Sequence, residues 1–487
     1  MTEDKLLIVN LGGFQAQTLA QRLRGCSIYC ELVPAADAIA AIGERHPRGI
    51  IVIGSPDQEP ETVDSAMWSW GLPILGIGRG ALAMLRALGG QVEHEAMRDQ
   101  MLQVHYAQPS RLFGDISYSD RFVTRLYQLV LPEGFQVIAH GHGVPVAFAD
   151  ERRRLYGLQF GVEANDPEGL EILDRFAVDI CGCTRWWTVE NIVSSIIGDI
   201  RKKVGDGQAL MALSGGVDSS VCAALMHRAI GEQMHCLYID TGLMRKGDNI
   251  IVRERFGAAN GIAITCINAR ERFYDRLKGI TDPKEKWSVI GDEFTLIYQD
   301  EARRFPDVRY LVKGTIYPDI LNYSDDEQNL NELSGYELIE PARYLFKSEV
   351  REVGEYLGLD KVITSRQPLP GSGLAMRITG EASLEKLAIV READAILREE
   401  IENADLSRRL HRWCAQLSDT TSTGEGACHY VVALRAMTRS GFNSAAYRMP
   451  YDLLERAATR ILTELPVVDR VVFDLTPSPL RPEDWES

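Results

Sequence analysis

Residues 208–220 read Gln208-Ala209-Leu210-Met211-Ala212-Leu213-Ser214-Gly215-Gly216-Val217-Asp218-Ser219-Ser220, an apolar run followed by a glycine-rich loop. The apolar run is typical of a buried strand, and a helix is expected to begin near Asp218. Because Gly215 and Gly216 carry no Cβ, their backbone N–H groups can close around a phosphate. The N-terminus of the helix would direct the positive end of its dipole into the same space. Three serines of the loop add hydroxyl donors: Ser214, Ser219 and Ser220.

The loop differs from a Walker-type loop because it has no lysine and lacks that spacing. It therefore predicts a cradle for pyrophosphate, of the kind used when ATP is split between its α and β phosphates. The alternative is an ordinary Ser/Gly-rich turn between a strand and a helix.

Length and composition indicate an enzyme of several domains. The chain has 487 residues, 45% of them hydrophobic, which predicts two to four domains at about 100–200 residues each. No window approaches about 18 uninterrupted apolar residues, and the N-terminus lacks the basic start of a signal peptide. We therefore expect a cytoplasmic protein that does not associate with a membrane.

Charge and cysteine usage exclude other classes. The net charge is −16 and no block is rich in lysine or arginine, so the chain is not expected to wrap a nucleic acid. A local basic site for a nucleotide phosphate stays open. The nine cysteines lack the spacing of zinc ligands, which favours reduced structural thiols.

The chain reads as three blocks. In the first, to Trp187, continuous apolar runs at Leu6–Leu11, Gly49–Gly54 and Pro73–Ile77 predict an open α/β domain with a parallel sheet covered on both faces. The second block, 188–366, predicts another such domain, with further strands at Met234–Asp240, Ile264–Ile267 and Tyr310–Gly314 and a long helix at Pro283–Arg304.

The third block, 367–487, opens with Pro/Gly punctuation and predicts a small α+β domain with mixed strands. Its expected elements are a charged helix at Ser383–Glu400, a strand at Tyr430–Met437, a helix at Tyr451–Leu462 and a strand at Arg470–Leu475.

Several motifs resemble those of the GMP synthetase family. They are Ser214–Ser220, Tyr238–Leu243, Gly314–Asp319, Leu345–Arg351, Pro370–Arg377, Val432–Ala436 and Pro450–Arg456. The resemblance implies an amidotransferase-like domain at 1–187, an ATP-pyrophosphatase domain at 188–366 and a dimerisation and acceptor-binding domain at 367–487. It also implies a homodimer formed by the third block.

The resemblance further implies a chemistry. The family transfers AMP from ATP onto a carbonyl oxygen of a purine nucleotide, and a nucleophile then displaces the AMP. The loop would hold the pyrophosphate and Asp218 would place Mg²⁺, so catalysis would depend on positioning and electrostatics. The implied ATP-binding set is Ser214, Gly215, Gly216, Val217, Asp218, Ser219, Ser220, Tyr238, Ile239, Gly314 and Thr315.

Some of these roles have structural alternatives. Lys347 and Lys313 are candidates for stabilising phosphate charge, but Lys347 could also be a solvated helix lysine. Asp319 is a candidate for substrate binding or the metal, and could equally cap a helix. Tyr238 and Ile239 could be ordinary core residues.

The first block resembles a class I glutamine amidotransferase that has lost its reactive groups. The family's cysteine turn, G-I-C-x-G, reads here with Gly78 at the cysteine position, and the Q-F-H-P-E stretch has Gly161 at the histidine position. Glu163 is retained. Cys30 lies outside this turn. Without a thiol and an imidazole there is no nucleophile and no base, so we expect no glutaminase activity.

The acceptor site also departs from the family. The segments at Asp325–Asn329, Arg366–Pro370 and Gly424–Tyr430 lack basic groups that family members carry there. In the family these segments frame the xanthosine monophosphate pocket. Arg377, Arg481 and Glu486 are the remaining candidates for substrate binding, since a phosphate monoester needs cationic or backbone donors.

Three functions stay open. The first is an ATP-dependent ligase that adenylates a purine-type nucleotide and inserts ammonia from solution or from a separate protein. The second uses the same activation to insert sulfur, which cysteines such as Cys222, Cys236, Cys266 or Cys428 could carry. The third is a catalytically silent paralogue that acts as a binding or regulatory subunit.

Overall fold

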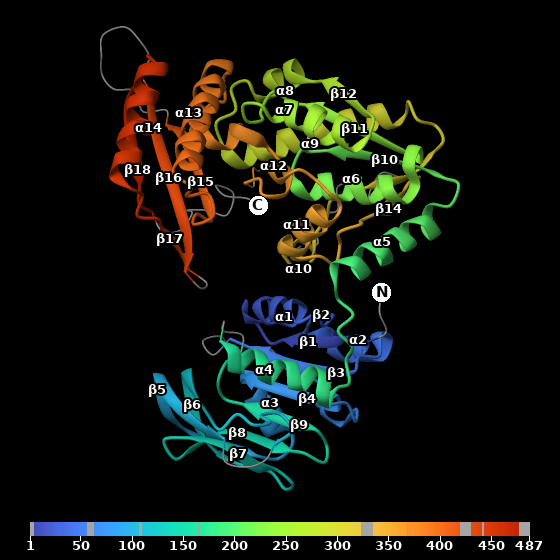
Figure 1. The fold of residues 1–487 in the computed structure, drawn as a ribbon, viewed down its shortest axis with the longest axis vertical. Helices are drawn as coiled ribbons and strands as arrows, with labels where there is room; N and C mark the ends of the chain where they lie inside the picture. Colours follow the sequence, from blue (N-terminus) through green and yellow to red (C-terminus); the bar gives the residue numbers. More distant parts are fainter. Residues whose placement is uncertain are drawn as a thin grey trace. The chain divides into compact units, whose positions relative to one another are not determined.

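The computed structural model describes residues 4–55, 63–106, 110–162, 166–322, 335–367, 369, 371–418, 430–440 and 443–476. The chain forms two compact units, Met1–Ile192 and Val193–Ser487 (Figure 1). The second unit thus contains the second sequence block from Val193 on together with the third block. The three domain limits given above stay a prediction. Across the described ranges, no helix has the length and apolar character needed to span a bilayer.

The first unit is built on one large sheet. Its strands are β1 (Leu6–Asn10), β2 (Cys30–Pro34), β3 (Gly49–Gly54), β4 (Ile74–Gly78), β5 (Gln91–Tyr106), β6 (Tyr118–Val130), β7 (Gln136–Gly141), β8 (Val144–Asp150) and β9 (Leu155–Leu158). Counting described residues, these nine strands follow the order β2-β1-β3-β4-β9-β8-β7-β5-β6. Its α-helices are α1 (Gln15–Gly25), α2 (Ala38–Arg45), α3 (Arg79–Ala87) and α4 (Pro167–Arg175).

The predicted parallel part of this sheet is confirmed, and an antiparallel part is added to it. Strands β2, β1, β3, β4 and β9 pair in parallel. Leu6, Leu7, Ile8 and Val9 of β1 are all fully buried, which explains the continuous apolar run. Strands β8, β7, β5 and β6 extend the sheet antiparallel. Much of β5 and β6 is exposed, so those two long strands have no continuous apolar run to reveal them.

The second unit contains a parallel sheet with β10 at its centre. Its strands are β10 (Gln208–Leu213), β11 (Met234–Asp240), β12 (Ile264–Asn268), β13 (Val308–Val312) and β14 (Glu337–Ile339). In the described part of the chain these five strands follow the order β12-β11-β10-β13-β14, and every pairing is parallel. This is the doubly wound α/β arrangement that the alternating pattern predicts.

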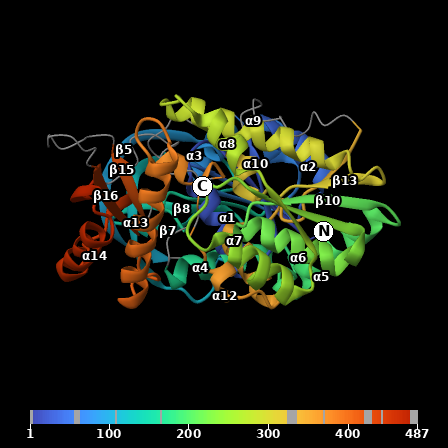
Figure 2. The ribbon, with the colours of Figure 1, turned by 90° about the horizontal axis from the view of Figure 1, so that it is seen from above.

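Helices cover both faces of this sheet. They are α5 (Val189–Val204), α6 (Val217–Ile230), α7 (Asp248–Ile250), α8 (Arg270–Leu277), α9 (Pro283–Ala302), α10 (Tyr317–Asn322), α11 (Lys347–Tyr356) and α12 (Lys361–Thr364). Figure 2 shows α8 and α9 on one side of the strands and α5 and α6 on the other. The hydroxyl of Tyr298 on α9 donates to the Leu210 carbonyl of β10 over 2.9 Å, which fixes the helix to the central strand.

The third block forms a small mixed sheet, as predicted. Its elements are α13 (Leu384–Asn403), β15 (Arg412–Ser418), β16 (Tyr430–Ser440), β17 (Asn443–Ala446), α14 (Tyr451–Glu464) and β18 (Val468–Asp474). β15 and β17 pair antiparallel with β16, whereas β18 pairs in parallel with it. Buried residues of both helices join one continuous core with those of the five-stranded parallel sheet, from Leu210 to Val468.

Candidate active site

The glycine-rich loop lies at the switch point of the parallel sheet. β11 and β13 flank β10 on its two sides, and the strand order runs outward from β10 in both directions. In open α/β sheets ligands bind beyond the carboxyl ends of the strands at such a point. Residues 214–216 follow the carboxyl end of β10 directly and lead into α6.

The backbone of the loop requires a glycine at position 215. Gly215 has φ +75°, and a Cβ on it would lie 2.8 Å from Cγ2 of Val252. Gly216 is extended and forms the N-cap of α6 without any side-chain capping bond. A helix leaves its first N–H groups without intrahelical acceptors, and here these include the groups of Val217 and Asp218. The loop therefore offers backbone donors and a helix dipole to an anion.

The serine hydroxyls stabilise the loop itself. Oγ of Ser219 and Oγ of Ser220 donate to the Gly216 carbonyl over 3.1 and 2.9 Å. Oγ of Ser214 accepts from the Gly216 N–H over 3.2 Å and bonds to Oγ of Ser219 over 3.0 Å. In this conformation the serine hydroxyls thus bond within the turn and hold its shape, which leaves the backbone N–H groups at the start of α6 as its donors toward an anion.

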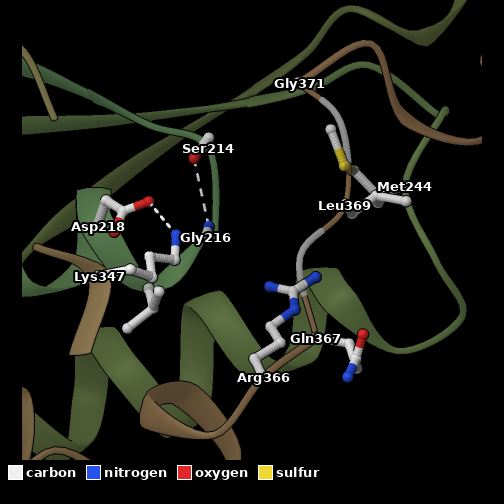
Figure 3. Close-up of a pocket in the computed structure, with 10 residues that line it drawn as sticks. Ser214, Gly216, Asp218, Met244, Lys347, Arg366, Gln367, Leu369 and Gly371 are labelled. Atoms are coloured by element: carbon white, nitrogen blue, oxygen red, sulfur yellow. Dashed lines mark hydrogen bonds and ion pairs between the residues drawn. The ribbon is translucent and has the colours of Figure 1, made fainter. Parts of the chain in front are cut away.

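Asp218 and Lys347 come together from distant parts of the sequence. Asp218 lies in the first turn of α6, and Lys347 is the first residue of α11. Nζ of Lys347 is paired with Oδ2 of Asp218 (Figure 3). Both side chains are partly exposed, at 34% for Lys347 and 24% for Asp218. Among described residues, the second oxygen of Asp218, Oδ1, is buried without a hydrogen-bond partner. The lysine is therefore held beside the loop rather than in open solvent.

Asp319 and Lys313 belong to the same charged surroundings. Oδ2 of Asp319 accepts from the Ile316 N–H over 2.8 Å at the start of α10. In this structure its side chain therefore caps the helix, the alternative to a role in substrate or metal binding. Burial raises the pKa of the Asp319 carboxyl, and nearby Asp218 raises it further, while Lys347 and Lys313 oppose the rise. Lys313 follows β13 and donates its backbone N–H to the Ile339 carbonyl over 3.0 Å.

Gly314 and Thr315 pack against the same helix start. A Cβ on Gly314 would lie 3.4 Å from the Ser219 nitrogen, an ordinary contact distance, so this segment runs directly beside the first turn of α6. Thr315 is buried, and its Oγ1 has no hydrogen-bond partner within the described ranges.

A cavity of about 160 Å³ opens over the loop. Its lining residues are Ser214, Gly216, Val217, Asp218, Met244, Lys347, Arg366, Gln367, Leu369 and Gly371. Figure 3 shows Asp218 and Lys347 on one side and Met244 and Leu369 on the other. The sequence predicted no role for Met244, and it placed Arg366 only in a segment that frames the acceptor pocket in the family. The Pro/Gly punctuation after Arg366 marks a loop there but not its place beside the glycine-rich turn.

Other predicted residues lie outside the lining. Ile239 is in the core of the sheet, and the Tyr238 hydroxyl donates to Oδ1 of Asn249 over 2.6 Å. Burial raises the pKa of Tyr238 above its ordinary value. Arg377 is buried and paired with Oδ1 of Asp394, so it is not among the residues that face the cavity.

Several predicted acceptor residues lie outside the described part of the chain. They are Arg481, Glu486, residues 325–329 and residues 424–429. Their roles stay predictions.

The residues present fit a magnesium ion that is shared with phosphates. Oδ1 of Asp218 is a carboxylate oxygen with no partner among described residues, and carboxylate oxygen suits Mg²⁺. No group of three or more His, Cys, Asp or Glu side chains in the described ranges could hold a metal by itself. Magnesium commonly takes one or two carboxylates and completes its shell with water and substrate phosphates.

The chain is similar to known proteins over its whole length. Residues 7–180 match the model of class I glutamine amidotransferases, and residues 399–485 match the GMP synthase C-terminal domain. A glutamine-hydrolyzing GMP synthase of Acetivibrio thermocellus is 39% identical, with all of both chains covered. Those of Thermomicrobium roseum and Clostridium perfringens are 41% and 38% identical, covering 99% of this chain and 97% and 100% of theirs.

The chain belongs to the GMP synthase family. Family membership confirms the predicted resemblance and the class of enzyme, an ATP-dependent ligase that forms a C–N bond. The α/β fold class is likewise confirmed.

The cysteine turn of the amidotransferase domain is present in shape. Gly78 ends β4, caps α3 and has φ +56° and ψ −116°. A Cβ there would meet only the Gly54 carbonyl oxygen, at 3.7 Å. Gly161 follows β9, and Glu163 lies outside the described residues. The turn is built as a nucleophile elbow would be, but it carries no side chain.

The cysteines of the second unit that could carry sulfur are mostly enclosed. Cys222 and Cys236 are buried, and burial raises the pKa of both thiols. Cys266 is exposed on β12, and Cys428 lies outside the described residues. Since the thiolate is the reactive form, Cys222 and Cys236 are poor sulfur carriers.

Proposed function

We propose that this protein is a GMP synthase-type ligase that does not make its own ammonia. It uses ATP to adenylate a carbonyl oxygen of a purine-type nucleotide, with xanthosine monophosphate as the first candidate, and ammonia then displaces AMP. The observation that carries the proposal is the cavity at the switch point, which joins the glycine-rich loop to the Asp218–Lys347 pair.

The residues around the cavity suit cleavage between the α and β phosphates. Negative charge that develops on the leaving pyrophosphate would face the N–H groups at the start of α6 and the ammonium group of Lys347. Fixed donors of this kind stabilise a transition state without reorganising. Asp218 would hold Mg²⁺ through Oδ1. That ion, when bound, would neutralise charge on the phosphate oxygens.

The nucleophile is proposed to come from outside the chain. Gly78 and Gly161 stand where the family has a thiol and an imidazole. Without those side chains there is no thiol to attack the glutamine amide carbonyl and no base to take the proton of such a thiol. Ammonia from solution or from a separate protein is then the remaining source of nitrogen. The buried thiols of Cys222 and Cys236 give the sulfur alternative no support.

Exposed apolar side chains on the third block support the proposed homodimer. They lie on α14 and at β18, and are Tyr451, Leu462, Val472 and Leu475, with exposed fractions of 80%, 42%, 40% and 69%. Large exposed apolar groups often mark a protein contact.

The direct test follows an oxygen atom. The purified protein is given Mg²⁺, ATP, ammonium chloride and xanthosine monophosphate labelled with ¹⁸O at its C2 carbonyl. We expect GMP and pyrophosphate to form in equal amounts, with the label in AMP. Asp218→Ala should abolish pyrophosphate release while the circular dichroism spectrum stays unchanged.

Other outcomes would contradict the proposal. Label that stays in the purine would exclude adenylation of the carbonyl. Pyrophosphate release by Asp218→Ala at the wild-type rate would remove Asp218 from the site. A folded protein that releases no pyrophosphate with any purine nucleotide would be the silent paralogue.

A further inference from the structure

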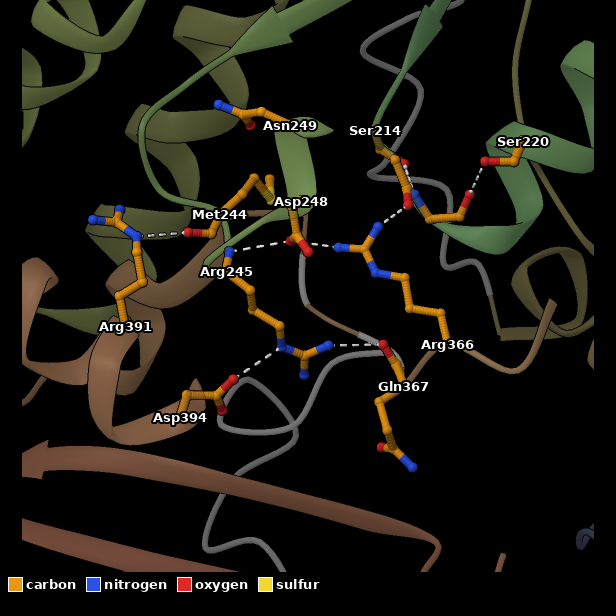
Figure 4. Close-up of polar contacts among 12 residues, drawn as sticks. Ser214, Ser220, Met244, Arg245, Asp248, Asn249, Arg366, Gln367, Arg391 and Asp394 are labelled. Carbon is orange, nitrogen blue, oxygen red and sulfur yellow. Dashed lines mark hydrogen bonds and ion pairs between the residues drawn. The ribbon is translucent and has the colours of Figure 1, made fainter. Parts of the chain in front are cut away.

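Arg366 connects the glycine-rich loop to the segment from the end of β11 to the start of α7, residues 241–248, which we call the second loop. Its Nη1 donates to the Gly215 carbonyl, and its Nη2 is paired with Oδ2 of Asp248 (Figure 4). Arg366 also lines the cavity. The planar guanidinium group thus bridges a backbone oxygen of the phosphate loop and a buried carboxylate, which a point charge such as lysine cannot do in one geometry.

Asp248 is itself held in place by buried charges. It is 2% exposed and accepts the Arg245 N–H through Oδ2 over 3.1 Å. The Arg245 side chain pairs through Nε with Oδ2 of Asp394 over 3.3 Å and donates through Nη1 to the Gln367 carbonyl over 2.9 Å. Asp394 lies on α13 and also pairs with Arg377. Acidic and basic groups therefore alternate from the third block to the phosphate loop.

Helix α13 fixes the second loop at another point as well. Arg391 lies three residues before Asp394 on this helix and donates through Nε to the Met244 carbonyl over 2.9 Å. It also donates to the Gly242 carbonyl. Because residues three apart lie on one helix face, Arg391 and Asp394 hold the loop from a common surface (Figure 4).

The contact to Gly215 matters because a phosphate site must present N–H groups and not carbonyl oxygens. Gly215, at φ +75°, could rotate its peptide more freely than other residues. A carbonyl turned toward the pyrophosphate would repel it. The guanidinium of Arg366 holds this carbonyl away from the pyrophosphate site. The Gly216 N–H of the same peptide then keeps its bond to Oγ of Ser214, and the turn into α6 keeps its shape.

We propose that Arg366 is a positioning residue for the pyrophosphate loop, anchored by Asp248 and through it by the Arg245–Asp394 pair of the third block. This inference rests on the proposed function and assigns Arg366 to the loop rather than to the acceptor. It predicts that Arg366 controls the rate of pyrophosphate release and not the affinity for the acceptor.

The test compares Arg366→Lys with the wild type. Lysine keeps the positive charge beside Asp248 but lacks the two fixed guanidinium donors that contact Gly215 and Asp248. We expect kcat for pyrophosphate release to fall roughly 10- to 100-fold, the size of effect that a small misplacement causes. The KM for xanthosine monophosphate should stay within about twofold, because uniform acceptor binding is untouched. The affinity for inorganic pyrophosphate, measured by calorimetry, should fall together with kcat.

Two further variants separate positioning from folding. Arg255→Lys is the matched control, since Arg255 and Asp360 form an exposed pair at 3.3 Å away from the cavity lining, and it should keep wild-type values. The double variant R366M/D248N removes both charges, so no buried charge is left unpaired. It should fold and should show the same loss of pyrophosphate affinity.

Other outcomes would contradict this proposal or the function on which it rests. A raised acceptor KM with unchanged kcat would place Arg366 on the acceptor. Wild-type kcat and pyrophosphate affinity in both variants would show that the contact has no role. If the wild type binds pyrophosphate but catalyses nothing, the proposed function fails, and the pyrophosphate affinities still decide on Arg366.

Discussion

The pair of Lys347 and Asp218 illustrates how a partly exposed ion pair differs from an ordinary surface one. Exposed pairs contribute about 0–1 kcal/mol to stability. Here the pair closes one wall of a cavity beside a helix N-terminus, so we assign it to the reaction and not to the fold.

Replacement of Lys347 by methionine should therefore cost activity and little stability. We expect kcat for pyrophosphate release to fall roughly 100- to 1000-fold, as for loss of one charge-stabilising donor. The melting temperature should stay close to that of the wild type. Lys202→Met, at an exposed position on α5, is the control and should leave both quantities unchanged. A Lys347→Met enzyme with normal kcat would return this lysine to the role of a solvated helix residue.

Asp319 predicts a dependence of stability on pH. Burial, followed by nearby Asp218, raises its pKa above the ordinary value of 3.8. Just above pH 3.8, the folded protein therefore keeps a proton that the unfolded chain has lost. The stabilisation from this group is complete below pH 3.8 and is lost as the pH rises through the folded-state pKa.

The variant Asp319→Asn removes this dependence, because an amide does not ionise and its oxygen can still accept the Ile316 N–H. Its free energy of unfolding at pH 7 should exceed that of the wild type, and it should change less from about pH 4 to 6. Urea titrations at several pH values measure this. Asp292→Asn, at an exposed position on α9, should behave as the wild type, and equal slopes for all three proteins would contradict the assignment.

At the scale of elements, the sequence pattern predicts a helix or strand well where the element is marked by its own residues. Strand Gln208–Leu213 and strand Met234–Asp240 have the predicted limits, and α9 differs only at its C-terminal end. The predicted helix Ser383–Glu400 is α13, Leu384–Asn403. Strands β5 and β6 were missed because β5 is mostly exposed and β6 interrupts its buried residues with exposed ones, so neither has a continuous apolar run.

The start of α9 shows such a local signal. Oδ1 of Asp282 accepts the Glu285 N–H over 3.0 Å, and Pro283 is the first helical residue. Asp282→Ala should destabilise the protein by about 1 kcal/mol, whereas Asp282→Asn should cost only a few tenths. Hydrogen exchange should accelerate in the first turn of α9 in the alanine variant only. Equal exchange in both variants would show that the cap contributes nothing.

The candidate site could be predicted only in part, for the same physical reason. The loop and its glycines are encoded within one short stretch, and Lys347 follows from its motif. Met244 and Arg366 reach the cavity through tertiary packing, which no local pattern reveals. Arg377 fits the family motif as well, but its side chain pairs with Asp394 in the interior. A motif names a residue type and not the direction in which that residue points.

For the whole molecule, Gly78 and Gly161 at the family's cysteine and histidine positions predict how nitrogen is supplied. With ATP and xanthosine monophosphate, ammonium chloride should support GMP formation and glutamine should not. Because free ammonia is the nucleophile, the KM for total ammonium should fall as the pH rises. Chromatography of GMP and glutamate measures both. Glutamate released by the purified chain would contradict the loss of activity at Gly78 and Gly161.

The cavity takes its walls from the turn after β10, the loop that carries Met244, Lys347 of α11, and residues Arg366, Gln367, Leu369 and Gly371. The second of these is gripped by Arg391 of α13. Truncation of the chain after Arg366 would consequently remove part of the cavity lining. It would also expose to solvent the apolar core that extends from Leu210 to Val468. The proposed ATP-cleaving domain is therefore not expected to fold or work by itself. A protein engineered to contain it must also contain the C-terminal sheet and helices.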